Sequence, residues 1–147
     1  MSTYVDTSVL LKRVLIEEGS DAAHSVWAAS DVLCSTEFVI VEARAALAAA
    51  RRAGRIKSSQ HEQAKSDLVQ LLDELAIIEV THALVIEASE LAEAESLRGY
   101  DAVHLATALT AGATLFASAD APLCAAADRR GMAVANPLSA GVELEDR

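Results

Sequence analysis

Four acidic side chains, far apart along the chain, are the residues of this sequence that could do chemistry together. Asp6, Asp101 and Asp120 each stand where a strand or loop is expected to lead into a helix. Glu42 lies inside a predicted helix and shares a face with apolar neighbours at 3.6-residue spacing, so we expect its carboxylate to point inward. These neighbours are Phe38, Val39, Ala45, Ala46 and Ala49. We therefore expect the four acids to converge on one pocket.

A pocket of four carboxylates needs positive charge. Two like charges about 4 Å apart repel by about 4 kcal/mol at an effective dielectric of about 20, so four cannot stay ionised together without a counter-ion. Oxygen ligands without cysteine or clustered histidine favour a hard dication, Mg²⁺ or Mn²⁺. Such an ion acidifies a bound water and holds a phosphate oxygen, which is the equipment for hydrolysing a phosphodiester.

Each aspartate also has a simpler explanation. Asp6, Asp101 and Asp120 could be helix N-caps, a role worth about 1 kcal/mol each. Glu42 resists this explanation because it lies well inside its helix, where no cap is possible. A buried salt bridge to an arginine would satisfy it without any metal, and this alternative stays open.

The basic residues closest to these acids in sequence have two interpretations. His104, three residues after Asp101, could join a metal site, but its neighbours Leu105 and Ala108 favour packing. Five cations occupy a short segment without acids: Arg44, Arg51, Arg52, Arg55 and Lys57. They could stabilise a helix C-terminus as solvated charges, or contact RNA or a partner protein.

The apolar pattern predicts strands that alternate with helices. The predicted strands are Thr3–Val5, Val32–Ser35, Ala76–Val80, Ala113–Ala117 and Met132–Ala135. The predicted helices are Ser8–Glu18, Ala22–Ala29, Thr36–Ala53, Ser58–Leu75, Ala83–Leu97, Ala102–Ala111 and Ala121–Arg130. Such alternation is typical of βαβ units, so we expect a three-layer α/β/α domain with a central parallel sheet of four to five strands.

This topology would bring the acids to one edge of the sheet. Ligand sites of open parallel sheets lie at the carboxyl ends of the strands. Asp6 directly follows the first predicted strand, and Asp120 follows the strand 113–117 after a short turn. Asp101 opens the helix that leads into that strand, and a short helix would start it near the same edge.

Length and composition favour one folded domain. The chain has 147 residues, 52% of them hydrophobic, so we expect a single domain over 1–147, with 136–147 as a loosely held tail. Its net charge of −10 repels polyanions at long range, so any nucleic-acid contact must be local, and a basic partner is favoured. Cys34 and Cys124 lack metal-binding spacing and are expected to be reduced, packed thiols.

The sequence also bears on location. The first six residues lack the basic and apolar regions of a signal peptide, so we expect a cytoplasmic protein. Residues 102–119 contain no Asp, Glu, Lys or Arg, but polar residues interrupt them, so a helix and a buried strand explain this stretch better than a membrane span.

Four segments together resemble a known family. They are YVDTSVLL (4–11), TEFVIVEARAAL (36–47), GYDAVHLATA (99–108) and LFASADAPL (115–123). In order and spacing they are similar to PIN-domain ribonucleases, specifically VapC-type toxins of toxin–antitoxin pairs, over nearly the whole chain. DAVHLA is the most distinctive piece.

The resemblance implies a PIN-like fold and a Mg²⁺-dependent or Mn²⁺-dependent endoribonuclease that cleaves structured RNA, often tRNA or rRNA. It also implies a homodimer that a cognate VapB-type antitoxin silences. By similarity, Asp6 and Asp101 would bind the metal directly, and Glu42 and Asp120 directly or through water. Thr7, Ser8 and Ser118 are close enough in sequence to orient these ligands or a phosphate.

Three other functions use similar acids. A receiver-type phosphoacceptor domain needs a lysine at a late strand end, but the last lysine here is Lys65. A haloacid-dehalogenase-like phosphatase needs a second aspartate two residues after the nucleophile, where this chain has Ser8. A catalytically silent α/β protein-interaction domain, in which the aspartates are only caps, remains the alternative.

Overall fold

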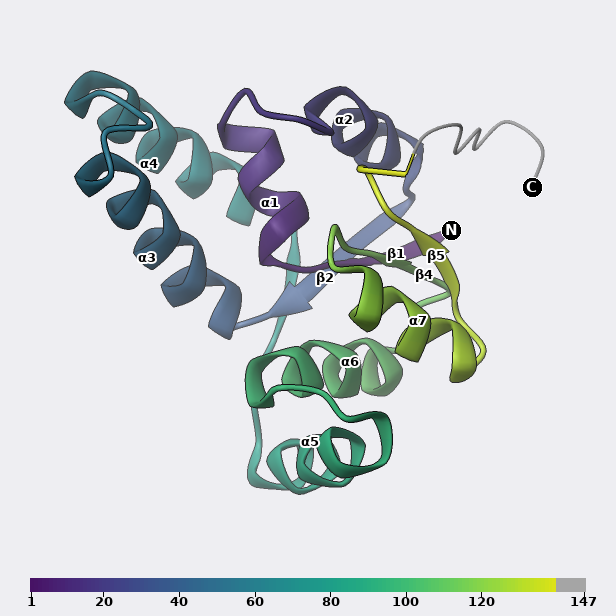
Figure 1. Cartoon of the computed structure of the whole chain (residues 1–147). Helices are drawn as coiled ribbons and strands as arrows, with labels where there is room; N and C mark the ends of the chain where they lie inside the picture. The colour runs from purple at the N-terminus through teal and green to yellow at the C-terminus, as the bar shows by residue number, and fades with distance from the viewer. Residues whose placement is uncertain (140–147) are drawn as a thin grey trace.

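The computed structural model describes residues 1–139 and contains a parallel sheet with helices on both faces (Figure 1). Its five strands are β1 (Ser2–Val5), β2 (Val32–Thr36), β3 (Ala76–Ile78), β4 (Leu115–Ala117) and β5 (Ala133–Ala135). They are ordered β3-β2-β1-β4-β5, so β1 is central. The predicted three-layer α/β/α architecture is therefore confirmed.

In the described part of the chain, seven helices connect the strands: α1 (Thr7–Val14), α2 (Ser20–Ala29), α3 (Phe38–Arg52), α4 (Ser58–Leu72), α5 (His82–Glu95), α6 (Gly99–Ala111) and α7 (Ala121–Arg129). Each element predicted from the sequence is present within residues 1–139, with ends shifted by a few residues. Two shifts matter below. The first helix ends at Val14 rather than Glu18, and α6 begins at Gly99, so Asp101 lies inside its first turn.

Hydrogen bonds explain the early end of α1. The Ser20 hydroxyl donates to the Leu15 carbonyl at 3.0 Å and accepts from the Glu17 backbone N–H at 3.0 Å. Lys12 Nζ lies 2.9 Å from Glu17 Oε1. These contacts hold residues 15–18 in a loop, and this local competition with the helix is not visible in the apolar pattern.

Alternating side chains of the strands build a core on each face of the sheet. Val5, Leu33 and Ala117 pack with α1, α2, α3 and α4 on one face. Tyr4 and Phe116 point the other way and pack with α5, α6 and α7. Because successive side chains of a strand point to opposite faces, each face has its own core and its own layer of helices, as Figure 1 shows.

The strand order reverses at β1: the chain first adds strands on one side of it and then on the other. The first three strands are added outward from β1, and α5 and α6 then return the chain across the opposite face to β4, beside β1. Val5 pairs with Ala117 in register, so Asp6 and Ser118 come next on adjacent strands. This is a topological switch point, the usual ligand position of such sheets.

The start of the chain's last segment packs against Gly19, and the expectation of a loosely held tail over 136–147 stays a prediction. Pro137 is buried, and a Cβ placed on Gly19 would meet the Pro137 carbonyl oxygen at 3.1 Å. Gly19 also has a φ of +86°, so both the turn and this close approach favour glycine there. The remainder of the tail, 140–147, lies outside the described residues.

No helix within residues 1–139 is long and apolar enough to cross a membrane. Cys34 and Cys124 are buried free thiols, as expected.

Candidate active site

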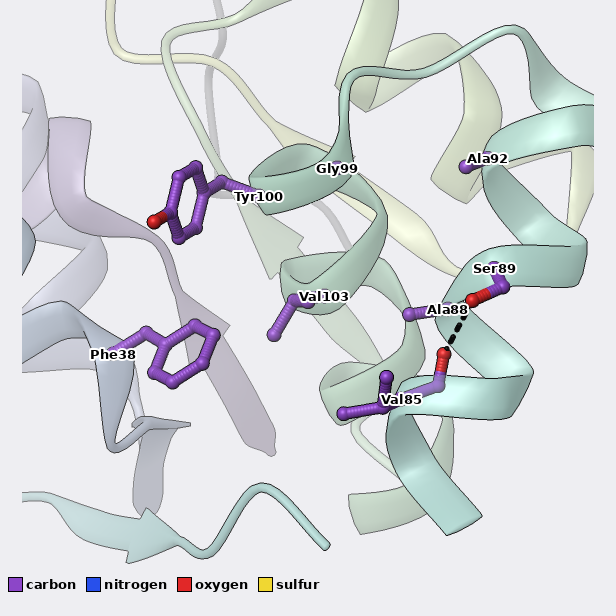
Figure 2. Close-up of a pocket in the computed structure, with 8 residues that line it drawn as sticks. All are labelled: Phe38, Val85, Ala88, Ser89, Ala92, Gly99, Tyr100 and Val103. Carbon is purple, nitrogen blue, oxygen red and sulfur yellow. Dashed lines mark hydrogen bonds between the residues drawn. The ribbon is translucent and has the colours of Figure 1, made fainter. Parts of the chain in front are cut away.

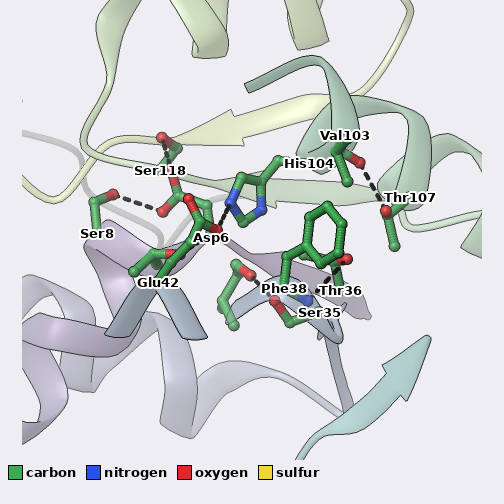
Figure 3. A network of polar contacts seen from close by, with 12 residues as sticks. Asp6, Ser8, Ser35, Thr36, Phe38, Glu42, Val103, His104, Thr107 and Ser118 are labelled. Carbon is green, nitrogen blue, oxygen red and sulfur yellow. Dashed lines mark hydrogen bonds and ion pairs between the residues drawn. The ribbon is translucent and has the colours of Figure 1, made fainter. Parts of the chain in front are cut away.

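Asp6 is held rigidly where β1 ends and α1 begins. Its Oδ1 accepts hydrogen bonds from the Val9 backbone N–H at 3.2 Å and from Ser8 Oγ at 2.6 Å. Its Oδ2 accepts from Ser118 Oγ at 2.6 Å (Figure 3). The residue is only 5% exposed. Asp6 therefore caps α1, as its position in the sequence allowed, and has an orientation fixed from two strand ends.

The burial of Asp6 is not balanced by an ion pair. Burial raises its pKa above the ordinary 3.8, and the charge of His104 and three hydrogen bonds offset this only in part. Within residues 1–139, no lysine or arginine forms a salt bridge with it. Asp6 is thus a carboxylate whose ionisation needs more positive charge than the chain places beside it.

Glu42 lies at the border of the core rather than inside it. The buried face of α3 consists of Val39, Ala43, Leu47 and Ala50. The Glu42 side chain is 25% exposed, and Ala45 and Ala49 are exposed. The apolar face predicted from the sequence therefore lay too close to Glu42. A run of alanines made the error possible, because alanine suits either side of a helix.

Within residues 1–139, Glu42 has two hydrogen-bond partners, both on the same oxygen. Its Oε1 accepts from Thr7 Oγ1 at 2.9 Å. The same oxygen lies 2.8 Å from His104 Nε2 (Figure 3). Burial acts to raise the pKa of Glu42, but the hydrogen bond and charge of His104, together with Thr7, lower it below its ordinary value. The carboxylate is therefore ionised, and its partner is a histidine rather than the arginine considered above.

His104 connects the core to the site. It is 3% exposed, and its Nδ1 lies 2.7 Å from the Tyr4 hydroxyl. Burial disfavours the charged imidazole, but the hydrogen bond with Glu42 and the charges of Asp6, Glu42 and Asp101 outweigh it and raise its pKa. The sequence favoured packing for His104 and missed this contact. Its position one turn after Asp101 was the signal that could have indicated it.

Asp101 and Asp120 share a cation. Asp120 caps α7 by accepting from the Leu123 backbone N–H at 3.0 Å. Asp101 caps nothing, because α6 begins two residues earlier and Arg98 is its N-cap. Arg98 Nε lies 3.2 Å from Asp101 Oδ2, and its Nη2 lies 3.8 Å from Asp120 Oδ2. Capping therefore explains Asp6 and Asp120 but not Asp101, whose contact is the ion pair with Arg98.

Three hydroxyl groups contact the acids, and two of them also accept backbone N–H groups. Ser8 Oγ donates to Asp6 and accepts from the Ala119 N–H at 2.9 Å. Ser118 Oγ donates to Asp6 and accepts from the Asp120 N–H at 3.0 Å. Together with the contact of Thr7 with Glu42, these bonds tie the first turn of α1 to the turn after β4. Their part in orienting a metal ligand stays a prediction.

Shared contacts link some of the acids without forming a closed ligand set. Ser118 Oγ contacts both Asp6 and the Asp120 N–H, and Arg98 contacts both Asp101 and Asp120. Burial and the charges of Asp6 and Asp120 raise the pKa of Cys124 to about 11. Within residues 1–139, no three His, Cys, Asp or Glu side chains are close enough together to hold a metal ion. The metal-binding role of the acids stays a prediction.

The side chains nevertheless suit a hard dication chemically. They offer carboxylate oxygens, no lysine or arginine of residues 1–139 forms a salt bridge with Asp6, and a guanidinium already lies across two of the others. Positive charge is thus favoured at this edge of the sheet.

Comparison with known proteins identifies the family of this fold. Residues 3–129 match the family model of the PIN domain. Ribonuclease VapC45 from Mycobacterium tuberculosis (strain CDC 1551 / Oshkosh) is 38% identical over 109 residues, which cover 74% of this chain and 76% of that protein. The chain therefore belongs to the PIN-domain family, within its branch of VapC-type ribonucleases.

Solved structures share the fold. VapC20 from Mycobacterium tuberculosis, a sarcin–ricin loop cleaving toxin, matches 84% of this chain and 94% of its own with a TM-score of 0.65 and 20% identity. VapBC2 from Rickettsia felis, bound to a DNA fragment from its promoter, matches 92% of this chain and 98% of that chain, with a TM-score of 0.63 and 16% identity. Likeness at such low identity establishes the fold alone.

Proposed function

We propose that this chain is a Mg²⁺-dependent endoribonuclease, able to use Mn²⁺, and the toxin of a VapBC-type toxin–antitoxin pair. The observation that carries the proposal is the environment of Asp6, a buried carboxylate at the switch point of the sheet with no salt bridge from residues 1–139. The ribonuclease named among its relatives supports RNA as the substrate.

Asp6 and Asp101 would bind the dication directly, and Glu42 and Asp120 directly or through water. The bound ion would supply the charge that acidifies a water and stabilises the phosphate. Ser8 and Ser118 hold the Asp6 carboxylate in one orientation from both sides. The Tyr4–His104 pair does the same for Glu42 from the core.

Glu42 has one oxygen available for the reaction. Both of its hydrogen bonds go to Oε1, and within residues 1–139 none is made to Oε2. Because the pKa of Glu42 is lowered, the side chain is an acceptor near neutral pH. Oε2 would therefore accept a hydrogen bond from the attacking water and orient it toward a phosphate.

The net charge of the chain and its similarity to VapC-type proteins support the proposed substrate and partner. With a net charge of −10, the protein would bind RNA only through local contacts, in a structured loop of tRNA or rRNA. VapC20 is named a sarcin–ricin loop cleaving toxin, and the name VapBC2 joins a VapB to a VapC. A basic VapB-type antitoxin would complement the acidic surface, and both partners would act in the cytoplasm.

An exposed apolar groove supports a homodimer. A cavity of about 670 Å³ lies between α5, α6 and the start of α3 (Figure 2). Phe38, Val85, Tyr100 and Val103 are among its lining residues, and the Tyr100 side chain is 62% exposed. An apolar surface of this kind marks an interaction site. We assign it to a second copy of the chain, whose matching groove would cover it.

Cleavage assays test the proposed function. Purified protein should cut total RNA at defined positions with Mn²⁺ or Mg²⁺ and not with EDTA, as mapped by new 5′ ends. Asp6→Asn and Asp101→Asn should abolish the cuts, whereas Asp128→Asn, at the exposed end of α7, should keep them. Retained metal-dependent cleavage by both site variants would refute the assignment.

The alternative is a catalytically silent α/β protein-interaction domain. The capping bonds of Asp6 and Asp120 and the pairing of Glu42 with His104 favour it, because they give three acids hydrogen-bond partners without a metal. Titration with Mn²⁺ separates the two functions, since capping carboxylates should bind the ion only feebly.

A further inference from the structure

Arg98 lies across two of the candidate metal-binding acids, although it is a surface residue. Its Nε is 3.2 Å from Asp101 Oδ2 and its Nη2 is 3.8 Å from Asp120 Oδ2. The two acids come from different elements, the first turn of α6 and the N-cap of α7. One guanidinium therefore bridges two carboxylates that would bind the dication of the proposed function.

The backbone of Arg98 is fixed while its side chain is not. Ser96 ends α5 with a φ of +54°, and the Leu97 N–H donates to the Ala92 carbonyl at 3.0 Å. Leu97 packs against the core, and the Arg98 carbonyl accepts the Ala102 N–H at 2.9 Å. The Arg98 side chain is 85% exposed. It can thus leave the two acids without any change in the fold.

The pairing is weak enough to be displaced. Exposed ion pairs contribute at most about 1 kcal/mol, because water screens them. A dication carries twice the charge of a guanidinium and can approach the same Oδ2 atoms more closely, so it should win this competition. The displaced guanidinium would remain at the rim of the site, in a protein whose net charge otherwise repels RNA.

We propose that Arg98 exchanges partners: it pairs with Asp101 and Asp120 in the metal-free protein, and it binds a phosphate of the RNA when a dication holds these acids. Guanidinium groups bind phosphate through two parallel N–H donors, which suits this second role. The inference rests on the proposed function. It adds a device that makes RNA affinity depend on metal binding.

Metal affinity gives the first test. Calorimetric titration with Mn²⁺ should show that Arg98→Ala binds the ion roughly two- to fivefold more tightly than wild type, because one exposed ion pair no longer competes. Lys65→Ala removes an equal charge from α4, where the half-buried Lys65 pairs with Glu62, and should leave the affinity unchanged. Unchanged or weaker Mn²⁺ binding by Arg98→Ala overturns the proposal.

RNA binding gives the second test. A fluorescein-labelled single-stranded RNA of mixed sequence is titrated with protein in EDTA and in Ca²⁺, as a probe ion. Arg98→Ala should lose about tenfold in affinity in Ca²⁺, the effect of a charge-assisted hydrogen bond, and little in EDTA. The slope of log Kd against log salt should fall by about 0.7 in Ca²⁺ only. Arg98→Lys keeps the positive charge but lacks the two parallel N–H donors of the guanidinium, so it should lose less RNA affinity than Arg98→Ala.

The outcomes separate this inference from the proposed function. Equal losses in EDTA and Ca²⁺, or no loss in either, would overturn the exchange of partners while wild-type metal and RNA binding kept the proposed function intact. Failure of the wild-type protein to bind both Mn²⁺ and RNA would overturn both. Circular dichroism of Arg98→Ala should match wild type, because its side chain is exposed.

Discussion

Ser118 Oγ and Asp6 Oδ2 lie 2.6 Å apart across the ends of two neighbouring strands, although 112 residues separate them in the chain. The same hydroxyl accepts the Asp120 N–H at 3.0 Å. One fully buried side chain therefore links two candidate metal ligands. Because this hydroxyl is buried, solvent water does not replace it, so its removal should affect both acids.

Ser118→Ala should lower the free energy of unfolding by about 1–3 kcal/mol, because Asp6 loses a donor and the Asp120 N–H loses its acceptor. It should also weaken Mn²⁺ binding. Urea denaturation and calorimetric titration measure the two effects. Ser25→Ala is the control, since that exposed hydroxyl bonds only the Asp21 carbonyl of its own helix. Equal stability of the two variants would contradict the linking role of Ser118.

Asp6→Asn should stabilise the metal-free protein near neutral pH. The pKa of Asp6 is raised on folding, so this group stabilises the fold fully below its ordinary value of 3.8 and loses that contribution as pH rises through the folded pKa. An asparagine never ionises and avoids the loss. Thermal melting in EDTA should therefore show a gain at about pH 7 that shrinks as the pH falls. A gain independent of pH would show that ionisation of Asp6 is not the cause.

Tyr4→Phe should impair the proposed cleavage without disturbing the core. The variant leaves His104 Nδ1 without a partner, at a cost of about 1–2 kcal/mol, but keeps the ring stacked on Phe116 at 5.3 Å. Loss of orientation at Glu42 should reduce kcat more than it raises KM. Steady-state kinetics on a mapped RNA site would measure this. A change confined to KM would argue that the pair does not position Glu42.

Added Mg²⁺ should stabilise the wild-type protein. An ion that binds only the folded state at one hundred times its Kd adds about 2.7 kcal/mol. The shift in Tm should vanish in Asp6→Asn and Asp101→Asn and persist in Asp128→Asn. Scanning calorimetry with and without Mg²⁺ tests this independently of any RNA. A full shift in both site variants would place the ion elsewhere.

Val85→Lys should convert the proposed dimer to a monomer, because it puts a charge in the apolar groove lined by α5 and α6. Val69→Lys is a matched control: Val69 is 60% exposed on α4, away from this groove. Sedimentation velocity measures the mass of both variants. Dissociation by Val69→Lys, or a dimer that tolerates Val85→Lys, would move the interface to another face.

The order of strands and helices could be predicted because it depends on local patterns. Side chains that alternate along a strand place Tyr4 and Val5 on opposite faces of β1. Longer amphipathic runs indicate the helices. The ends were less accurate. The end of α1 depends on the Ser20 hydroxyl, and the start of α6 on Arg98, neither of which changes the apolar pattern.

The sequence by itself determined the fold class, the family resemblance and the acids that reach the carboxyl edge of the sheet, since these follow from residue type and spacing. Only the tertiary structure decided what those acids contact. His104 meets Glu42 across 62 residues and Tyr4 across 100, and Arg98 reaches Asp120 on another helix. Such contacts depend on strand order and on the rotation of each helix by fractions of a turn, which packing of the whole core sets and no local pattern encodes.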